Sequence, residues 1–160
     1  MSLKTSKYEI VLGRIDNRLV HGRVGIIWTR HFQATVILVV DDEMSQDFFQ
    51  QELMNRTVDN KDIKILYWSV QEAVENMDRL DGERILLITR TPFEMNSLIQ
   101  KGIQIPKVNL GIMHRSIGKR KFASKFIFVD DKDLEEIYAI RDSGAVVTAN
   151  ILPDAKEIVI

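Results

Sequence analysis

Short apolar segments alternate with helical patterns along nearly the whole chain, and this alternation restricts the fold more than any other feature. Seven runs rich in β-branched residues have the length and composition of buried strands. They span residues 8–12, 35–40, 63–68, 85–89, 108–110, 125–129 and 145–151. Apolar stripes at helical spacing lie between several of them: Val24, Ile27, Trp28 and His31; Val70, Ala73, Val74 and Met77; Leu134, Ile137 and Tyr138. This order predicts an open, mainly parallel β-sheet with helices on both faces, a three-layer α/β/α sandwich.

Residues at the predicted element boundaries agree with this order. Ser69 can cap the helix that follows the third strand, and Pro92 suits the first turn of a helix after Thr91. Gly102 and Gly144 stand where helices are expected to end. The chain has 160 residues, enough to bury about 70% of its unfolded surface. We therefore expect one domain over residues 1–160.

Charge and composition exclude several classes of function. The chain has 22 Lys and Arg residues against 23 Asp and Glu residues, a net charge of −1, which gives no whole-molecule basis for binding nucleic acid or an anionic membrane. It has no cysteine, which excludes disulfides, thiolate catalysis and cysteine-based zinc sites and favours the cytoplasm. No apolar run approaches the roughly 20 residues that a membrane span requires.

Functional groups are concentrated in residues 14–24, the predicted loop after the first strand, where open α/β sheets bind ligands. A turn over residues 18–21 would bring the Arg18 guanidinium beside the His21 imidazole. Gly22 would allow close backbone approach, and a helix starting after His21 would attract an anion. A phosphoryl group on His21 would then be stabilised by Arg18, with Asp16 holding Arg18 or fixing the imidazole tautomer. A structural or solvated histidine fits the same spacing, and the residues alone leave both interpretations open.

This loop, RIDNRLVHGRV at residues 14–24, resembles the RIDxRLxHGQV signature of IIB components of the mannose/fructose/sorbose phosphotransferase system (PTS). The similarity continues through residues 39–43, 86–89, 102–114 and 129–134 and covers essentially the whole chain. It implies a cytoplasmic phosphocarrier without a diffusible cofactor. Its histidine would accept a phosphoryl group from a IIA phosphohistidine and donate it to a sugar that arrives through the membrane components IIC and IID.

The resemblance also assigns roles to single residues. His21 matches the phosphorylated histidine, which in the family is modified on Nδ1, and Arg18 matches the arginine that contacts the phosphoryl group. Asp16 matches the acidic member of the loop. The chain departs from the family at Arg23, where Gln is usual, and at Ile112, where a second Gly is usual.

Further residues are predicted around the same site. Gly22 and Arg23 are expected to bind the phosphoryl group with Arg18, and Arg23 would add a cation there or on the docking face. Arg14, Ser69 and His114 are predicted as supporting residues, although His114 fits a solvated loop position better than a site residue. The sugar stays open between mannose, fructose, sorbose and an amino sugar such as N-acetylgalactosamine; segments 24–28 and 91–92 resemble the galactosamine branch slightly more.

Other candidate sites have simpler explanations. Two acidic runs, at residues 41–43 and 130–133, could suggest cation sites, but acidic residues also cap helix starts and neither run has calcium-loop spacing, so we assign no metal. His31 is expected to pack or cap beside the first helix. Two rival functions remain: a receiver-like domain phosphorylated on Asp41 or Asp42, and a ligand-binding module that is never phosphorylated.

The stretch from residue 110 to 125 interrupts the alternation of strands and helices. It is rich in glycine and cations and predicts a basic loop or hairpin. A nucleotide phosphate loop is excluded, because six residues rather than four separate Gly111 from Gly118, and Arg120 stands where Ser or Thr is required. The cations fit either a solvated face or a docking patch for an acidic partner.

Overall fold

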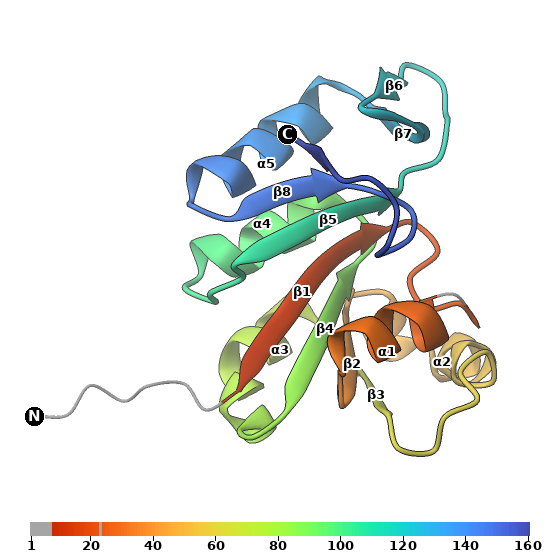
Figure 1. Ribbon diagram of the computed structural model, residues 1–160. Helices are drawn as coiled ribbons and strands as arrows, with labels where there is room; N and C mark the ends of the chain where they lie inside the picture. Colours follow the sequence, from red (N-terminus) through yellow and green to blue (C-terminus); the bar gives the residue numbers. More distant parts are fainter. Residues whose placement is uncertain (1–7, 23) are drawn as a thin grey trace, which may run out of the picture.

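The central sheet of the computed structural model, which describes residues 8–22 and 24–160, confirms the predicted sandwich (Figure 1). Within these residues, seven strands follow the order β3-β2-β4-β1-β5-β8-β9, parallel except for β9, which is antiparallel to β8. The strands are β1 (Glu9–Asp16), β2 (Val36–Val40), β3 (Lys64–Trp68), β4 (Arg84–Thr89), β5 (Lys107–Ile112), β8 (Val146–Ala149) and β9 (Ile158–Val159). The buried strands β2 and β4 are the near-continuous apolar runs that a sheet covered on both faces requires.

Helices cover both faces of this sheet and enclose one apolar core on each. One face is covered by η1 (Val24–Trp28), α1 (Thr29–Phe32), η2 (Met44–Gln46) and α2 (Phe48–Asn55). The other is covered by α3 (Val70–Asn76), η3 (Met77–Leu80), α4 (Pro92–Gln100) and α5 (Asp131–Asp142). No helix in the described part of the chain is both long and apolar enough to cross a bilayer.

The predicted boundaries are confirmed where side chains or glycines set them. Ser69 accepts a hydrogen bond from the Glu72 N–H in a complete capping box at the start of α3. Pro92 occupies the first turn of α4. Gly102 and Gly144 follow α4 and α5 with φ values of 97° and 106°, the left-handed region that glycine tolerates best. The basic stretch forms a hairpin, β6 (Arg120–Phe122) and β7 (Ser124–Val129), as one of its two predicted forms.

Three expectations about the elements are wrong. The first strand was expected over 8–12 but continues to Asp16, so Arg14 and Asp16 belong to β1 rather than to a loop. The first helical stripe does not include Ile27 and His31, which are exposed, because the segment begins as a π-helix that buries Val24 and Trp28. Two further stripe residues, Val74 and Tyr138, are also exposed.

Candidate functional site

The connection from β1 to η1 begins with a tight turn at the carboxyl end of a strand in the interior of the sheet, between β4 and β5. The Leu19 N–H donates to the Asp16 carbonyl at 2.9 Å, and Leu19 has a φ of 57°. Left-handed backbone is unfavourable for leucine, but the fully buried Leu19 side chain packs in the core beneath η1 and offsets this cost. The turn directs the chain back over the strand end, so that His21 lies above Asp16.

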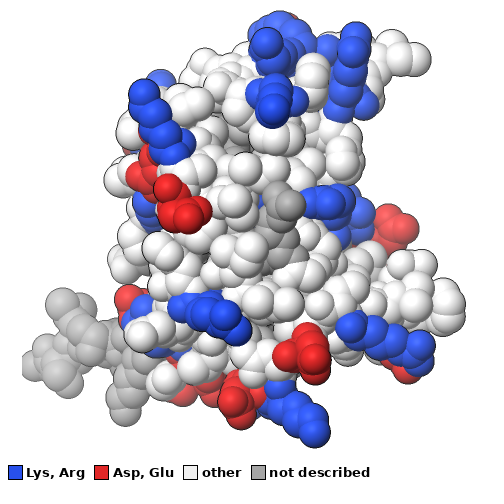
Figure 2. All heavy atoms as spheres, turned by 45° about the vertical axis from the view of Figure 1, so that its right-hand side comes forward, with Lys and Arg blue, Asp and Glu red and all other residues white. Residues whose placement is uncertain are grey.

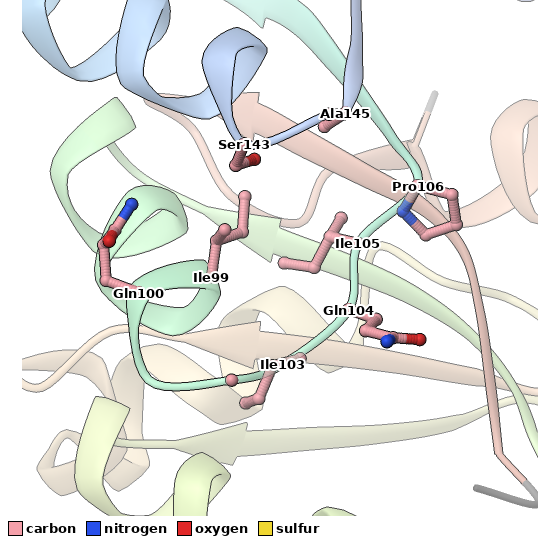
Figure 3. Close-up of a pocket in the computed structure, with 10 residues that line it drawn as sticks. Ile99, Gln100, Ile103, Gln104, Ile105, Pro106, Ser143 and Ala145 are labelled. Carbon is pink, nitrogen blue, oxygen red and sulfur yellow. The ribbon is translucent and has the colours of Figure 1, made fainter. Parts of the chain in front are cut away.

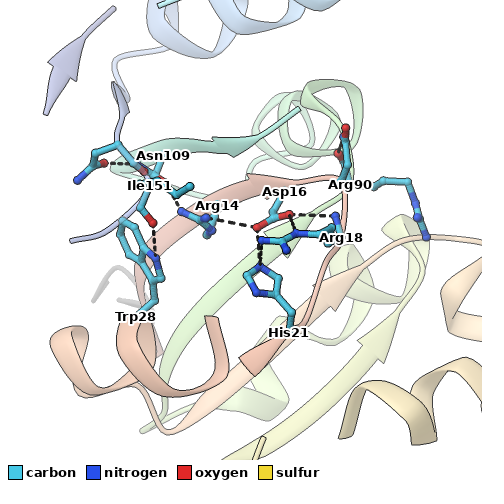
Figure 4. A network of polar contacts seen from close by, with 10 residues as sticks. Arg14, Asp16, Arg18, His21, Trp28, Arg90, Asn109 and Ile151 are labelled. Carbon is cyan, nitrogen blue, oxygen red and sulfur yellow. Dashed lines mark hydrogen bonds and ion pairs between the residues drawn. The ribbon is translucent and has the colours of Figure 1, made fainter. Parts of the chain in front are cut away.

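His21 forms one short hydrogen bond that determines its chemistry (Figure 4). Its Nε2 lies 2.9 Å from Oδ2 of Asp16, and its side chain keeps 17% of its surface exposed. An ionised carboxylate only accepts hydrogen bonds, so Nε2 bears the hydrogen and the lone pair is on Nδ1. Arg18 Nη2 lies 3.3 Å from Nε2, a close approach of a cation to the ring. The free lone pair and the adjacent cation are what attack on a phosphoryl group requires.

Asp16 is fully buried, and both of its carboxylate oxygens accept hydrogen bonds. Oδ1 accepts from the Arg18 N–H at 2.9 Å, and Oδ2 accepts from Arg14 Nη2 at 3.3 Å as well as from His21. Burial acts to raise the pKa of Asp16, but the hydrogen bond from His21, the charge of Arg14 and the Arg18 N–H together lower this pKa below its ordinary value. Asp16 is therefore held as a carboxylate.

Arg14 is also fully buried and lies beside Asp16 on β1. Its Nη1 donates to Asn109 Oδ1 at 2.6 Å, and its guanidinium carbon lies 4.6 Å from the centre of the Trp28 ring. A Cβ atom at Gly111 would lie 2.4 Å from that carbon, so only glycine leaves room for the guanidinium. Arg14 therefore contacts Asp16 from inside the protein, and its role as a supporting residue of the site stays a prediction.

Three residues, Arg18, Gly22 and Arg23, are predicted to bind the phosphoryl group, and the structure describes two of them. Arg18 is 44% exposed beside His21 and available to an incoming anion. Gly22 follows His21, but a Cβ there would make only an ordinary contact of 3.7 Å with the Thr57 carbonyl, so the structure does not show the expected steric need for glycine. Arg23 lies outside the described residues.

The remaining candidate histidines and Ser69 lie in different places. The His114 N–H donates to Asn17 Oδ1 at 2.6 Å, which brings this exposed residue beside the β1–η1 connection. Ser69 follows β3, three strands from β1, and its hydrogen bonds are those of the α3 cap. His31 is exposed and its ring contacts Phe32 edge-on at 4.9 Å. A role for Ser69 or His114 in the site stays a prediction.

Both acidic runs act at helix starts. Asp41 accepts from the Met44 N–H at 2.9 Å and pairs with Arg90, while Asp42 accepts from the Val70 N–H at 2.9 Å. Asp130 accepts from the Asp133 N–H at 2.8 Å to cap α5. Within the described ranges, no three acidic or histidine side chains are grouped as metal ligands.

Figure 3 shows a pocket of about 570 Å³, which lies at the opposite end of the parallel strands from His21. It is lined by residues 99, 100, 102–106 and 143–145, at the amino ends of β5 and β8. These residues include no charged side chain. The pocket offers no charged group to neutralise a phosphoryl anion and does not belong to the His21 site.

Sequence reasoning missed Asn17, Trp28, Asn109 and Gly111. Asn17 Nδ2 donates to the Arg90 carbonyl at 2.8 Å, so with its bond to His114 it connects the turn to the ends of β4 and β5. The other three surround Arg14. Asn17 lies inside the RIDNRLVHGRV segment and could have been found there, whereas Trp28, Asn109 and Gly111 reach the site only through the helix covering the sheet and the pairing of β1 with β5.

Comparison with known proteins gives a consistent result. The family model described as "PTS system sorbose subfamily IIB component" matches residues 10–159. The chain is 39% identical over 151 residues to N-acetylgalactosamine-specific phosphotransferase enzyme IIB component 1 of Escherichia coli (strain K12), covering 93% of this chain and 95% of that protein. It is 31% identical over 152 residues to the PTS system fructose-specific EIIB component of Bacillus subtilis (strain 168), covering 93% and 92%. The crystal structure of the E. coli N-acetylgalactosamine-specific IIB component 1 superposes with a TM-score of 0.90 at 36% identity, over 95% of this chain and 99% of that one.

Proposed function

The chain belongs to the sorbose subfamily of PTS IIB components, phosphotransferases that pass a phosphoryl group from IIA to a sugar, and from this premise we propose that His21 is its phosphorylated residue. The observation that supports this most strongly is the 2.9 Å contact between His21 Nε2 and Asp16 Oδ2. It leaves the Nδ1 lone pair as the nucleophile, in a ring that is partly exposed and lies beside Arg18. Arg18 and Gly22, together with Arg23, are proposed to surround the phosphoryl group.

The proposed reaction has two transfers. In the first, Nδ1 of His21 attacks phosphorus, a bond forms between Nδ1 and phosphorus, and the bond from phosphorus to the IIA histidine breaks. Nε2 keeps its hydrogen and its bond to Asp16 throughout, so the positive charge that develops on the ring faces a carboxylate. In the second, a sugar hydroxyl attacks the same phosphorus, the bond from phosphorus to Nδ1 breaks with its electron pair returning to Nδ1, and the hydroxyl proton passes to water. Arg18 neutralises part of the phosphoryl charge in both steps.

Components of this family work with IIA and with the membrane components IIC and IID. We propose that the donor and the acceptor of this chain dock in turn over the edge of the sheet that presents His21, on the cytoplasmic side of the membrane. Figure 2 shows Lys and Arg side chains gathered at the top of the molecule, where Figure 1 places β6 and β7. Lys119 and Arg120 of this stretch pair with Asp133 and Asp131. Within the described residues, Arg115, Lys121 and Lys125 make no ion pair, which supports a docking patch for an acidic partner.

The identities favour an amino sugar as substrate. Two relatives named as N-acetylgalactosamine-specific are 39% and 35% identical to the chain, while the fructose-specific relative is 31% identical. We therefore propose N-acetylgalactosamine as the sugar. Transfer to this sugar should exceed transfer to mannose, fructose and sorbose when each is supplied with its own membrane components; the opposite order would contradict the assignment.

The site assignment is tested by labelling with phosphorylated IIA and mapping the modified residue. Wild type and a His31→Ala control should be labelled on His21, and His21→Ala should keep the fold but take no label. The label should survive alkali and be lost in acid, as a phosphohistidine is. An alkali-labile label on Asp41 or Asp42 would support the receiver-like alternative, although both side chains already bind helix N–H groups. Absence of any label would support a ligand-binding module.

A further inference from the structure

The buried guanidinium of Arg14 is held by three residues that come from two elements, β5 and η1; Figure 4 shows two of them, Asn109 and Trp28. Asn109 on β5 accepts from Nη1 at 2.6 Å, and Trp28 of η1 places its ring 4.6 Å from the guanidinium carbon. Gly111 on β5 leaves the space that the guanidinium fills, since a Cβ there would lie 2.4 Å from this carbon. We call Asn109, Trp28 and Gly111 the Arg14 cradle.

The cradle is itself fixed by the chain that follows β8. Asn109 Nδ2 donates to Asn150 Oδ1, and Asn150 Nδ2 donates to the Leu152 carbonyl at 2.8 Å. Trp28 Nε1 donates to the Ile151 carbonyl at 3.3 Å. The orientation of both Asn109 and Trp28 is therefore set by hydrogen bonds that do not involve Arg14, as expected of groups that determine where the guanidinium lies.

The cradle affects the reaction through Asp16. Arg14 Nη2 reaches Oδ2 of Asp16 at 3.3 Å, and the same oxygen accepts from His21 Nε2 at 2.9 Å. A guanidinium keeps its charge at every accessible pH, so its distance from Asp16 is what the cradle controls. If the guanidinium moved away, burial would favour the protonated carboxyl, which donates a hydrogen bond instead of only accepting. The imidazole hydrogen could then move to Nδ1, leaving the lone pair on Nε2, directed at the protein interior.

We propose that Asn109, Trp28 and Gly111 are positioning residues for phosphoryl transfer, which hold Arg14 against Asp16 and thereby keep the nucleophilic lone pair of His21 on Nδ1. The proposal rests on the proposed function in taking His21 as the phosphorylated residue. It extends the site from residues 14–22 into the interior of the sheet.

Gly111→Ala tests the proposal, and Gly13→Ala is its matched control. Both glycines lie buried in strands, but a Cβ at Gly13 would meet Ile105 and Met95 at 2.9 and 3.0 Å instead of Arg14. Both variants should lower the melting temperature. Long-range ¹H–¹⁵N correlations of the His21 ring, recorded at neutral rather than alkaline pH so that a protonated Asp16 carboxyl would persist, should show the Nε2–H tautomer in wild type and Gly13→Ala. In Gly111→Ala the Nδ1–H tautomer should increase, and labelling by phosphorylated IIA should slow roughly ten-fold, equal to about 1.4 kcal/mol of activation free energy.

Asn109→Ala gives a second test should Gly111→Ala not fold. It removes the acceptor at 2.6 Å without adding bulk and should shift the tautomer in the same direction. Equal tautomer populations in wild type and both cradle variants would overturn the proposal, as would an Nδ1–H tautomer in wild type. A label on a residue other than His21 in wild type would contradict the proposed function instead, because the tautomer measurement needs no phosphorylation.

Discussion

Asp16 is the residue on which the whole site depends. A buried carboxylate is unfavourable unless its oxygens are paired, and here one oxygen accepts from the Arg18 N–H while the other meets Arg14 and His21. Because His21 is one of these partners, the interactions that keep Asp16 ionised also select the imidazole tautomer. The Asp16 side chain therefore affects both the stability of the fold and the tautomer of His21.

This coupling predicts a pH dependence of stability. The pKa of Asp16 is lower in the folded protein than in the unfolded chain. The carboxylate therefore stabilises the fold above the unfolded-state pKa of about 3.9, and this stabilisation is lost as the pH falls through the folded-state pKa. Asp16→Asn should lose roughly 3 kcal/mol at pH 7, because the buried Arg14 loses its carboxylate. Urea unfolding should show that the free energy of unfolding falls less between pH 7 and pH 3 for Asp16→Asn than for wild type. An equal loss in both proteins would contradict the lowered pKa.

Arg18 should affect catalysis far more than stability. Its side chain is 44% exposed, so Arg18→Ala should change the free energy of unfolding by no more than about 0.5 kcal/mol. The rate of labelling by phosphorylated IIA should fall roughly ten-fold to a hundred-fold, as expected for a hydrogen bond between charged groups worth about 1.5 to 3 kcal/mol. Arg79→Ala, which removes an exposed cation from η3, is the control and should label at the wild-type rate. Equal rates for the two variants would exclude Arg18 from the site.

The sequence predicted the site residues that lie close together in the chain, but not those that reach the site from other elements. His21, Arg18 and Asp16 lie within a few residues of one another, so turn geometry and the family signature bring them together. Asn109 and Gly111 reach Arg14 only because β5 pairs with β1 in a register that sets Arg14 opposite Asn109. Neither residue type nor local spacing indicates such a register. A fully buried arginine is also rare, so the residue type gives no sign that Arg14 lies on a buried strand.

At the level of elements, the β1–η1 connection is held by main-chain and side-chain bonds to both neighbouring strands. The Asn17 N–H donates to the Ile112 carbonyl at 2.9 Å, while its side chain bonds the Arg90 carbonyl and the His114 N–H. One residue therefore links the turn to the ends of β4 and β5, and this fixes the position from which His21 projects.

Asn17→Ala should loosen this connection. Loss of two side-chain hydrogen bonds should cost about 1 to 3 kcal/mol of stability, accelerate hydrogen exchange of the amides in residues 17–22, and slow labelling. Asn96→Ala is the control, because it also removes a side-chain hydrogen bond, the one from Asn96 on α4 to Glu136, but far from the turn. It should leave hydrogen exchange in residues 17–22 unchanged. Unchanged exchange in Asn17→Ala would show that other contacts fix the connection.

The elements that sequence reasoning found are those that bury an apolar face. The strands β2 and β4 appear as unbroken apolar runs, and α3, α4 and α5 have capping residues or glycines at their ends. The helix α2 was not predicted, and its apolar residues Phe48, Phe49 and Leu53 are exposed; β9 was not predicted because it has only two residues, both exposed. The stripe through Ile27 failed because a π-helix shifts the buried positions.

At the level of the whole molecule, the two apolar cores lie on opposite faces of one sheet and depend on the same strands. We propose on this basis that residues 1–160 unfold as one domain. Trp28 lies in one core and Trp68 packs against the other. The fluorescence of Trp68→Phe therefore reports on the core around Trp28, and that of Trp28→Phe reports on the core beside Trp68. In both variants the urea midpoint from fluorescence should coincide with that from far-UV circular dichroism. Separate midpoints would indicate two units.

The central claim is that the buried carboxylate of Asp16 accepts a hydrogen bond from Nε2 of His21, so that the lone pair on Nδ1 is the one available to the partner proteins. The most direct measurement is the ¹⁵N spectrum of the His21 ring after phosphorylation by phosphorylated IIA. The structure predicts phosphorus on Nδ1, with Nε2 still bearing a hydrogen bonded to Asp16. Phosphorus on Nε2, or an unmodified His21 in a labelled protein, would contradict it.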